Sequence, residues 1–296
     1  YIMELEFGVN SRFGRFPYFK AKKIVLHALK LGIKRFDTGI TYGNYKSQPL
    51  LARCLKSQIK KHREDISIST KCSAASAEYI EYCIKNSIYN FQCGYIDNFH
   101  LWGPSIKKLE KNEILRKLQL LRKQGLVKNI SANTHDLSTI KRISSGSYDE
   151  IRGILLDYNL LQQNRINYIR ESKKNNLKIF AGTSLCQGLL ISSVLKIFLR
   201  TKSPFYLGRA LINKDTKKFL NPSKKLRTYL NENYNNIKKE IPLSFLCHEE
   251  AIDYVPIGMM SYDSINKNVA IIKNPVDKKI IRSISNWAFQ NCQLEE

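Results

Sequence analysis

The sequence lacks long apolar runs, paired cysteines and metal-ligand spacings, and each absence excludes a class of protein. No stretch approaches the roughly 18 consecutive apolar residues of a membrane helix, so we expect no membrane span. Seven scattered cysteines, without a Cys-x-x-Cys pair or histidines at zinc spacing, argue against a disulfide framework and a structural metal. They favour reduced thiols and a cytoplasmic location. Because the chain starts at Tyr1 rather than methionine, an upstream targeting segment stays open.

Acidic residues are scarce relative to basic ones, and the formal net charge is +24. One interpretation is a surface that binds nucleic acid or an anionic membrane. The other is a lysine-rich composition spread over solvated helix faces. The basic residues of 107–142, 196–239 and 267–282 are interleaved with apolar residues at helical spacing, and no arginine-rich block carries aromatics. The pattern favours the second interpretation, so nucleic acid is not an expected partner.

Short apolar runs alternate with longer amphipathic ones, which is typical of a parallel sheet covered by helices. The predicted strands are Ile33–Phe36, Ile66–Thr70, Ile96–Leu101, Val127–Ala132, Ile154–Tyr158, Ile179–Ala181 and Tyr254–Ile257, with a weak or truncated first strand at Glu4–Gly8. The predicted helices are Ala21–Leu31, Leu50–Lys61, Tyr79–Gln92, Glu110–Gln124, Ser138–Ser144, Asn164–Asn175, Gly188–Leu199 and Ser244–Ala251.

This alternation over 296 residues predicts an α/β fold. We expect one domain, residues 1–296, that forms a (β/α)8 TIM barrel of parallel strands and outer helices. The stretch 192–240 contains no convincing strand and would be an enlarged connection before the last strand. An open doubly wound sheet is the alternative, but the sequence lacks the G-x-G-x-x-G turn that normally follows its first strand.

Three residues that can handle a proton lie at or just after predicted strand ends. Asp37 closes one strand, Tyr42 follows in a turn-rich segment, and Lys71 closes the next strand. The C-terminal ends of neighbouring barrel strands meet at one rim, so the three side chains are expected to converge there. An ammonium lowers the pKa of a nearby phenol, and a carboxylate holds the ammonium in place. The plainer interpretation is an ion pair beside a tyrosine that packs a loop.

The order Asp37-Thr38 before Tyr42-Gly43, with Lys71 closing the next strand, resembles the aldo-keto reductase family. Further segments extend the resemblance from about residue 21 to residue 270: Gly125–Ile130, Asp157–Leu161, Cys186–Leu190, and Ile257–Ser261 with Asn268. The resemblance implies a single (β/α)8 barrel. It also implies an oxidoreductase that transfers hydride from a nicotinamide cofactor to a carbonyl group.

By this resemblance, Tyr42 donates a proton to an aldehyde or ketone, Lys71 lowers the pKa of Tyr42, and Asp37 is the partner of Lys71. The implied cofactor is NADP(H) in preference to NAD(H), and no metal is expected. Free backbone N–H groups of a helix beginning near Gln187, and of the turn 258–261 with its helix, would seat phosphates. The implied cofactor-binding residues are Asn133, Thr134, Tyr158, Thr183, Gln187, Gly188, Gly258, Met259, Ser261 and Asn268.

Four positions depart from the family pattern. Trp102 stands where the family has a catalytic histidine, while His100 lies two residues earlier, about 6.6 Å deeper on the same side of the strand. His100 is either a substitute for that histidine or a hydrogen-bonded core residue. Leu155, Gly182 and Ser264 replace a glutamine, an aromatic or arginine, and an arginine that contact the cofactor. These losses support a second hypothesis, a catalytically impaired barrel that acts as a binding or regulatory protein.

Overall fold

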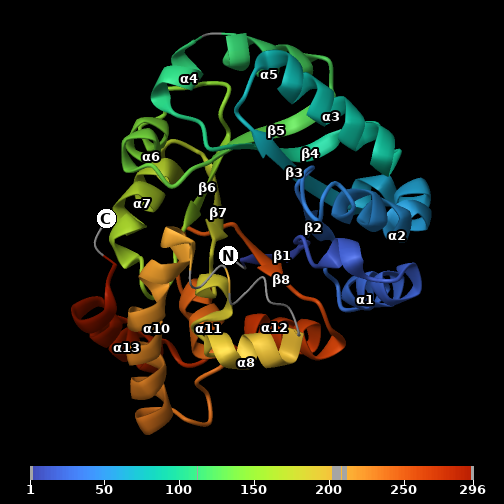
Figure 1. The fold of residues 1–296 in the computed structure, drawn as a ribbon. Coiled ribbons are helices and arrows are strands. Elements are labelled where there is room, and N and C mark those ends of the chain that lie inside the picture. Colours follow the sequence, from blue (N-terminus) through green and yellow to red (C-terminus); the bar gives the residue numbers. More distant parts are fainter. Residues whose placement is uncertain (1–2, 112, 202–207, 209–211, 295–296) are drawn as a thin grey trace.

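A computed structural model describes residues 3–111, 113–201, 208 and 212–294, and its strands form a closed parallel barrel in the order β1 to β8 (Figure 1). The predicted (β/α)8 barrel is confirmed. The strands are β1 (Glu4–Gly8), β2 (Arg35–Asp37), β3 (Ser67–Ser73), β4 (Ile96–Trp102), β5 (Val127–Asn133), β6 (Gly153–Asp157), β7 (Lys178–Gly182) and β8 (Tyr254–Gly258).

The described helices surround the barrel (Figure 1). They are α1 (Tyr18–Lys30), α2 (Ser47–His62), α3 (Ala77–Phe91), α4 (Ile106–Glu110), α5 (Glu113–Lys123), α6 (Leu137–Ser144), α7 (Ile166–Lys174), α8 (Val194–Thr201), α10 (Lys214–Asn233), α11 (Ile241–Cys247), α12 (Tyr262–Lys273) and α13 (Lys278–Cys292). Several begin with a side-chain cap that satisfies a free backbone N–H group; Ser76 caps α3 and Asp136 caps α6. Among the described residues, no helix combines the length and apolar character that crossing a membrane requires.

Three details of the predicted elements were wrong. The first strand is neither weak nor truncated, since β1 pairs along its length with β8 and also with β2, and the shortest strand is β2. The helix predicted over 110–124 corresponds to α5 and begins later than predicted, since Glu110 ends the separate short helix α4 and Lys111 leaves the helical conformation with a ψ of 37°. The helix predicted from Gly188 begins only at Val194, because residues 186–188 form a short 3-10 turn.

The connection between β7 and β8 contains α8, α10 and α11, and part of the predicted 192–240 segment lies outside the described residues. Two helices after β8, α12 and α13, complete the outer layer; the sequence predicted a helix after the turn 258–261 without giving its bounds, and α13 was not predicted. In Figure 1, α10 and α13 lie side by side at the same edge of the molecule. The rings of Tyr229 on α10 and Trp287 on α13 stack with centroids 3.8 Å apart, which fixes the long connection against the C-terminal helix.

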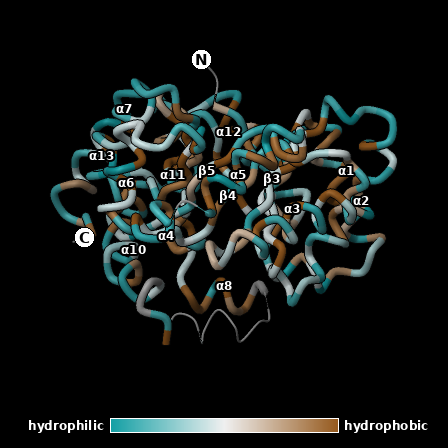
Figure 2. The backbone as a smooth tube through the Cα atoms, turned by 90° about the horizontal axis from the view of Figure 1, so that it is seen from above, coloured by the Kyte–Doolittle hydropathy of each residue, from teal (hydrophilic) through white to brown (hydrophobic). Residues whose placement is uncertain are grey.

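Successive strand residues point alternately outward to the helices and inward to the barrel axis. The outward positions, such as Phe7, Phe36 and Ile68, are fully buried apolar residues. Viewed from above, strands β3 to β5 lie in the middle, inside helices whose hydrophilic stretches face the periphery (Figure 2). The inward positions at mid-height include polar side chains, among them Glu6 and His100, where barrels of this kind usually carry branched apolar residues.

Candidate active site

Asp37 and Lys71 form a buried ion pair at the C-terminal end of the barrel. Asp37 is the last residue of β2 and pairs in register with Ser69, so Lys71 lies two residues further along β3. The Lys71 Nζ atom donates to both carboxylate oxygens of Asp37, at 2.6 and 2.7 Å. Both residues are about 95% buried, at 5% and 6% exposure. The pair therefore sits at the strand ends, where barrel enzymes place their chemistry.

The opposite charges of Asp37 and Lys71 stabilise each other. Burial lowers the pKa of Lys71, but the opposing attraction of Asp37 is strong enough to leave that pKa raised above its ordinary value. Burial raises the pKa of Asp37, and the ammonium 2.6 Å away counteracts the rise. The contact through both oxygens keeps the pair ionised.

Tyr42 lies in the loop after β2 and reaches the same ion pair. The Lys71 Nζ atom is 5.4 Å from the centre of the Tyr42 ring, and Tyr42 is one of the groups that raise the pKa of Lys71. Gly39 makes this approach possible, because a Cβ atom there would lie 3.1 Å from the Tyr42 ring and 3.2 Å from the Lys71 stem. The structure thus brings together the three residues that the sequence singled out.

The loop that carries Tyr42 is fastened at its end by Ser47. The Ser47 hydroxyl donates to the carbonyl oxygen of Asn10 and accepts from the backbone N–H of Gly14. The backbone N–H of Ser47 donates to the carbonyl oxygen of Tyr42. These bonds tie the loop after β2 to the segment after β1, so Tyr42 is held by backbone contacts on both sides of the loop.

Trp102 and His100 occupy different levels of the barrel. Trp102 ends β4 at the mouth, where 41% of it is exposed. His100 is fully buried, pairs in register with Lys71, and meets the Phe180 ring edge-on at 4.7 Å. Burial, followed by the charges of Lys71 and Arg35, lowers the pKa of His100 well below its ordinary value. His100 is therefore a neutral imidazole beneath the ion pair, and it lies two residues before Trp102 on β4.

Asn133 and Thr134 lie at the end of β5, next to Trp102 in register. Asn133 is 7% exposed, and no hydrogen bond among the described residues engages its side-chain amide. The Thr134 hydroxyl accepts from the backbone N–H of Asp136 and shapes the turn into α6. Tyr158, in contrast, packs in the core with its ring 5.4 Å from that of Phe245 on α11. Asn133 is thus the better placed of these residues to hold a ligand amide at the mouth.

The segment after β7 has an unusual backbone. Thr183, Cys186, Gln187 and Gly188 all have positive φ values, between 44° and 92°. Such conformations are costly for residues other than glycine and are concentrated at functional sites. The Gln187 side chain accepts from the Thr216 hydroxyl of α10 at 2.9 Å. The sequence predicted a helix N-terminus here that would bind a phosphate through its backbone N–H groups. That helix start was wrong, because residues 186–188 are a 3-10 turn and not a helix N-terminus.

The sequence prediction missed a histidine–aspartate pair at the same end of the barrel. Asp157 ends β6, is almost fully buried, and lies 2.8 Å from Nδ1 of His135. The Thr183 hydroxyl donates to Asp157 at 2.5 Å, and Arg165 is 3.9 Å away. The hydrogen bond to Asp157 raises the pKa of His135. The available signal was a carboxylate at the end of one strand and a histidine just after the neighbouring strand.

Gly258, Met259, Ser261 and Asn268 surround the start of α12, beyond β8. Ser261 caps α12 by accepting from the backbone N–H of Ser264, and the Ser264 hydroxyl completes a capping box. Lys267 pairs with Asp263 at 2.9 Å, so its charge is already opposed. Met259 is fully buried, while Asn268 is partly exposed. The first turn of α12 still has backbone N–H groups without helical partners, which is where a phosphate binds.

These observations fit a nicotinamide nucleotide. The unengaged Asn133 amide at the mouth suits the nicotinamide end, and the start of α12 suits a phosphate of the other end. One group among the described residues could also hold a metal ion: Glu6, Asp37 and His100 bring ligand atoms within 4.8 Å of one another.

Comparisons with known proteins agree with this geometry. The sequence matches the Aldo/keto reductase family over residues 4–287. It is 24% identical to L-galactose dehydrogenase from Arabidopsis thaliana over 276 residues, which covers 89% of this chain and 81% of that protein. Its fold is similar to the apo form of an aldo-keto reductase from Bacillus halodurans, with a TM-score of 0.73, 22% identity, and coverage of 97% and 92%. It is also similar to an aldo-keto reductase from Klebsiella pneumoniae in complex with NADPH, with a TM-score of 0.71, 12% identity, and coverage of 100% and 95%. The chain belongs to the aldo/keto reductase family.

Proposed function

We propose that this protein is an NAD(P)H-dependent oxidoreductase that reduces an aldehyde or ketone, with Tyr42 as the proton donor. The observation that carries the proposal is the buried Asp37–Lys71 pair with Tyr42 packed against it at the mouth of the barrel. Family membership supports the same reaction class.

Each residue of the site has its own role in the proton transfer. An ordinary phenol has a pKa near 10, so an acid that works near neutrality needs a shift of about 3 units, or about 4 kcal/mol. The Lys71 ammonium favours the phenolate of Tyr42, and a low-dielectric site strengthens that attraction. Asp37 keeps Lys71 charged and fixed in place. Tyr42 can therefore release its hydroxyl proton to a carbonyl oxygen as negative charge develops there.

The cofactor would be held at both ends of the mouth. A bound nicotinamide nucleotide supplies the hydride. Asn133 would hold the carboxamide, and the first turn of α12 with Ser261 would hold a phosphate. We favour NADP(H) over NAD(H), because the similar Klebsiella pneumoniae reductase was solved with NADPH. Ser264, in place of an arginine, predicts a weak grip on the 2′-phosphate and hence a modest preference.

The test compares Tyr42→Phe with Tyr45→Phe. Both tyrosines belong to the same loop, but Tyr45 is 60% exposed. NADPH oxidation is followed with a carbonyl panel that includes sugar aldehydes and lactones, and NADP reduction is followed with L-galactose, as the Arabidopsis thaliana relative suggests. Tyr42→Phe is expected to lower kcat by about 100-fold to 10,000-fold, and Tyr45→Phe to leave it unchanged. Equal rates for wild type and Tyr42→Phe would remove this role.

A binding or regulatory protein is the second candidate, favoured by one observation. By the sequence resemblance, Trp102 stands at the position of the family's catalytic histidine, and it offers a single N–H donor and cannot carry a proton in or out. Fluorescence titration with NADPH separates the two candidates. Tight binding without turnover on any member of the panel would favour the binding protein, whereas turnover that depends on Tyr42 would exclude it.

A further inference from the structure

Two buried polar side chains lie beneath the site of the proposed proton donor, and their polar atoms lack a complete set of hydrogen-bond partners among the described residues. Glu6 on β1 and His100 on β4 are both 0% exposed. The Oε2 atom of Glu6 and both ring nitrogens of His100 accept or donate no hydrogen bond among the described residues. Nevertheless, ligand atoms of Glu6, His100 and Asp37 lie within 4.8 Å of one another. Buried polar groups are nearly always satisfied, so a cluster of unsatisfied ones calls for a function.

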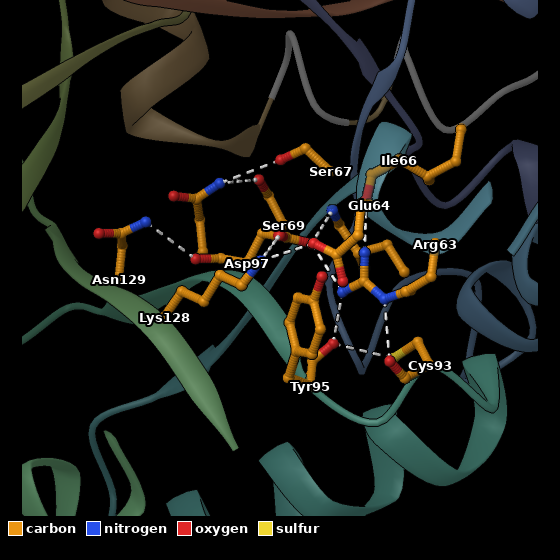
Figure 3. Close-up of polar contacts among 12 residues, drawn as sticks. Arg63, Glu64, Ile66, Ser67, Ser69, Cys93, Tyr95, Asp97, Lys128 and Asn129 are labelled. Carbon is orange, nitrogen blue, oxygen red and sulfur yellow. Dashed lines mark hydrogen bonds and ion pairs between the residues drawn. The ribbon is translucent and has the colours of Figure 1, made fainter. Parts of the chain in front are cut away.

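Hydrogen bonds connect this cluster to the opposite end of the barrel. The Oε1 atom of Glu6 accepts from the Ser69 hydroxyl at 3.1 Å and from Arg35 at 3.2 Å. The amide of Asn98 donates to the hydroxyls of Ser69 and Ser67, and Figure 3 shows these two serines close together in the polar network of that end.

The network ends in a polar cavity of about 380 Å³ that opens at the N-terminal ends of the strands. Arg35, Ser67, Asn98, Asn129 and Tyr254 contribute to its lining. Because Arg35 and Asn98 also contact Glu6 or its partner Ser69, one continuous set of polar side chains extends from this cavity to Glu6. Asp37 and Lys71 then continue it to the mouth.

The charges of the cluster favour a proton over a metal ion. The carboxylates of Glu6 and Asp37 are opposed by Arg35 at 3.2 Å and by Lys71 at 2.6 Å. A divalent cation would therefore raise a balanced buried cluster to a net charge of +2 and compete with Lys71 for Asp37. A proton added to Glu6 or His100 is a smaller change, and an imidazole and a carboxylate are the side chains best suited to carry it.

Glu6 is also poised to exchange a proton near neutrality. Burial raises its pKa to about 7, against the lowering effects of Arg35 and Lys71. The polar and titratable groups that face Glu6 come from three neighbouring strands: Arg35 and Asp37 of β2, Ser69 and Lys71 of β3, and Asn98 and His100 of β4. Tyr254 of β8 adds to them indirectly, because the Arg35 guanidinium stacks on the Tyr254 ring. A neutral His100 ring can accept a proton from a protonated Glu6 on one side and pass one on from the other.

We propose that Glu6 and His100 carry protons along the barrel axis and return to Tyr42, through Asp37 and Lys71, the proton that it gives to the product. The proposal rests on the function proposed above. Tyr42 loses its hydroxyl proton to the product oxygen and regains one from the Lys71 ammonium. The Lys71 amine takes a proton relayed by the Asp37 carboxyl from Glu6 or His100, and Glu6 regains its proton from water on the side of the cavity, where its partner Arg35 is part of the lining. One solvent proton is consumed per turnover, and no electrons move along the path.

Single-turnover and steady-state kinetics separate this role from a structural one. The variants are Glu6→Gln and His100→Asn. The control is Ser131→Ala, which removes a buried hydroxyl of the neighbouring strand that has no hydrogen-bond partner in the described part of the chain and is outside the proposed path. NADPH absorbance and a pH indicator are followed together by stopped flow after mixing with the carbonyl substrate. Circular dichroism and NADPH titration confirm that each variant folds and binds cofactor.

In both path variants, the first turnover should match wild type, because Tyr42 starts with its proton. The steady-state rate should then fall by about 10-fold, with proton uptake lagging behind NADPH oxidation and a larger solvent deuterium isotope effect on the slow phase than on the first turnover. Ser131→Ala should show no burst. Wild-type turnover with no burst in either path variant, or with both phases slowed equally, would remove the proton path only. A wild-type protein that oxidises no NADPH would remove the proposed function and this proposal together.

Discussion

Replacing Asp37 by asparagine should destabilise the protein, and the ordinary pKa of Lys71 sets an upper limit on the loss of stability. The substitution keeps the shape of residue 37 but leaves the Lys71 ammonium, which is 5% exposed, without its counter-charge. Removing one partner of a buried ion pair costs about 3 to 5 kcal/mol. The loss at pH 7 has a ceiling, because Lys71 can instead give up its proton. Its ordinary pKa of 10.5 lies 3.5 units above pH 7, which corresponds to about 5 kcal/mol.

The pH dependence of this loss follows from the sign of the pKa change. In wild type, the pKa of Lys71 is raised, so its contribution is complete below pH 10.5 and is lost only as the pH rises above that value. In Asp37→Asn, burial without the carboxylate lowers the pKa of Lys71. The unfolded state then binds more protons than the native state up to pH 10.5, and the variant gains stability as the pH rises. The ceiling at pH 9 is accordingly about 2 kcal/mol.

Urea unfolding at pH 7 and pH 9 measures both quantities. The control is Asp65→Asn, which breaks an exposed pair with Lys34 whose side chains are both 59% exposed, and it should have no measurable effect. In the double variant Asp37→Asn, Lys71→Met, the loss should be smaller than the sum of the two single losses. A stability for Asp37→Asn within about 0.5 kcal/mol of wild type, with no difference between the two pH values, would refute the reasoning.

Three further outcomes test other parts of the site. Because burial raises the pKa of Glu6 from 4.5 to about 7, the contribution of Glu6 to the unfolding free energy should fall by about 3 kcal/mol as the pH rises from 4.5 to 7. In urea titrations, Glu6→Gln should lack this component, and a pH profile identical to that of wild type would contradict the assignment. NMR titration should place the pKa of His135 above 6.5, and Asp157→Asn should lower it; no change would show that the bond between them does not form in solution. Gly39→Ala should displace Tyr42 and lower kcat/KM by about 10-fold with unchanged NADPH affinity, whereas a wild-type rate would show that the loop yields to the new methyl group.

The sequence predicted the barrel because the spacing of the apolar residues and the polar residues at the strand ends indicated the same fold along most of the chain. Apolar runs that end in polar residues marked the strands, and the residues at two of these ends, Asp37 and Lys71, proved to be an ion pair. The strand β1 looked weak because Glu6 interrupts its apolar residues. Its pairing with β2 and β8 closes the barrel, and closure is a property of all eight strands that a short segment does not reveal.

Other features depended on backbone conformations that residue type does not fix. The run after β7 has the residues of a helix start, but Cys186 and Gln187 adopt positive φ values and delay the helix to Val194. The pairing of His135 with Asp157 joins residues from the loop after β5 and the end of β6. The sequence shows only that both residues lie at or just after strand ends, and the closed barrel is what brings them together as partners.

The polar side chains inside the barrel show most clearly why the alternation of inward and outward strand residues was not enough to predict which of them meet. Counting back two residues from Lys71 gives Ser69, and counting back two from Trp102 gives His100, so the sequence does place polar residues at inward positions. Which of them meet depends on the stagger of strands that are not neighbours. Glu6 comes from β1, which pairs with β2, whereas His100 of β4 approaches Glu6 and Asp37 only because the sheet closes around a common axis. A contact of this kind links residues far apart in the chain without a hydrogen-bonded ladder between their strands. Substitutions at residues 6 and 100 should therefore affect the mouth of the barrel through the charges inside it, even if the pairing of every strand is preserved.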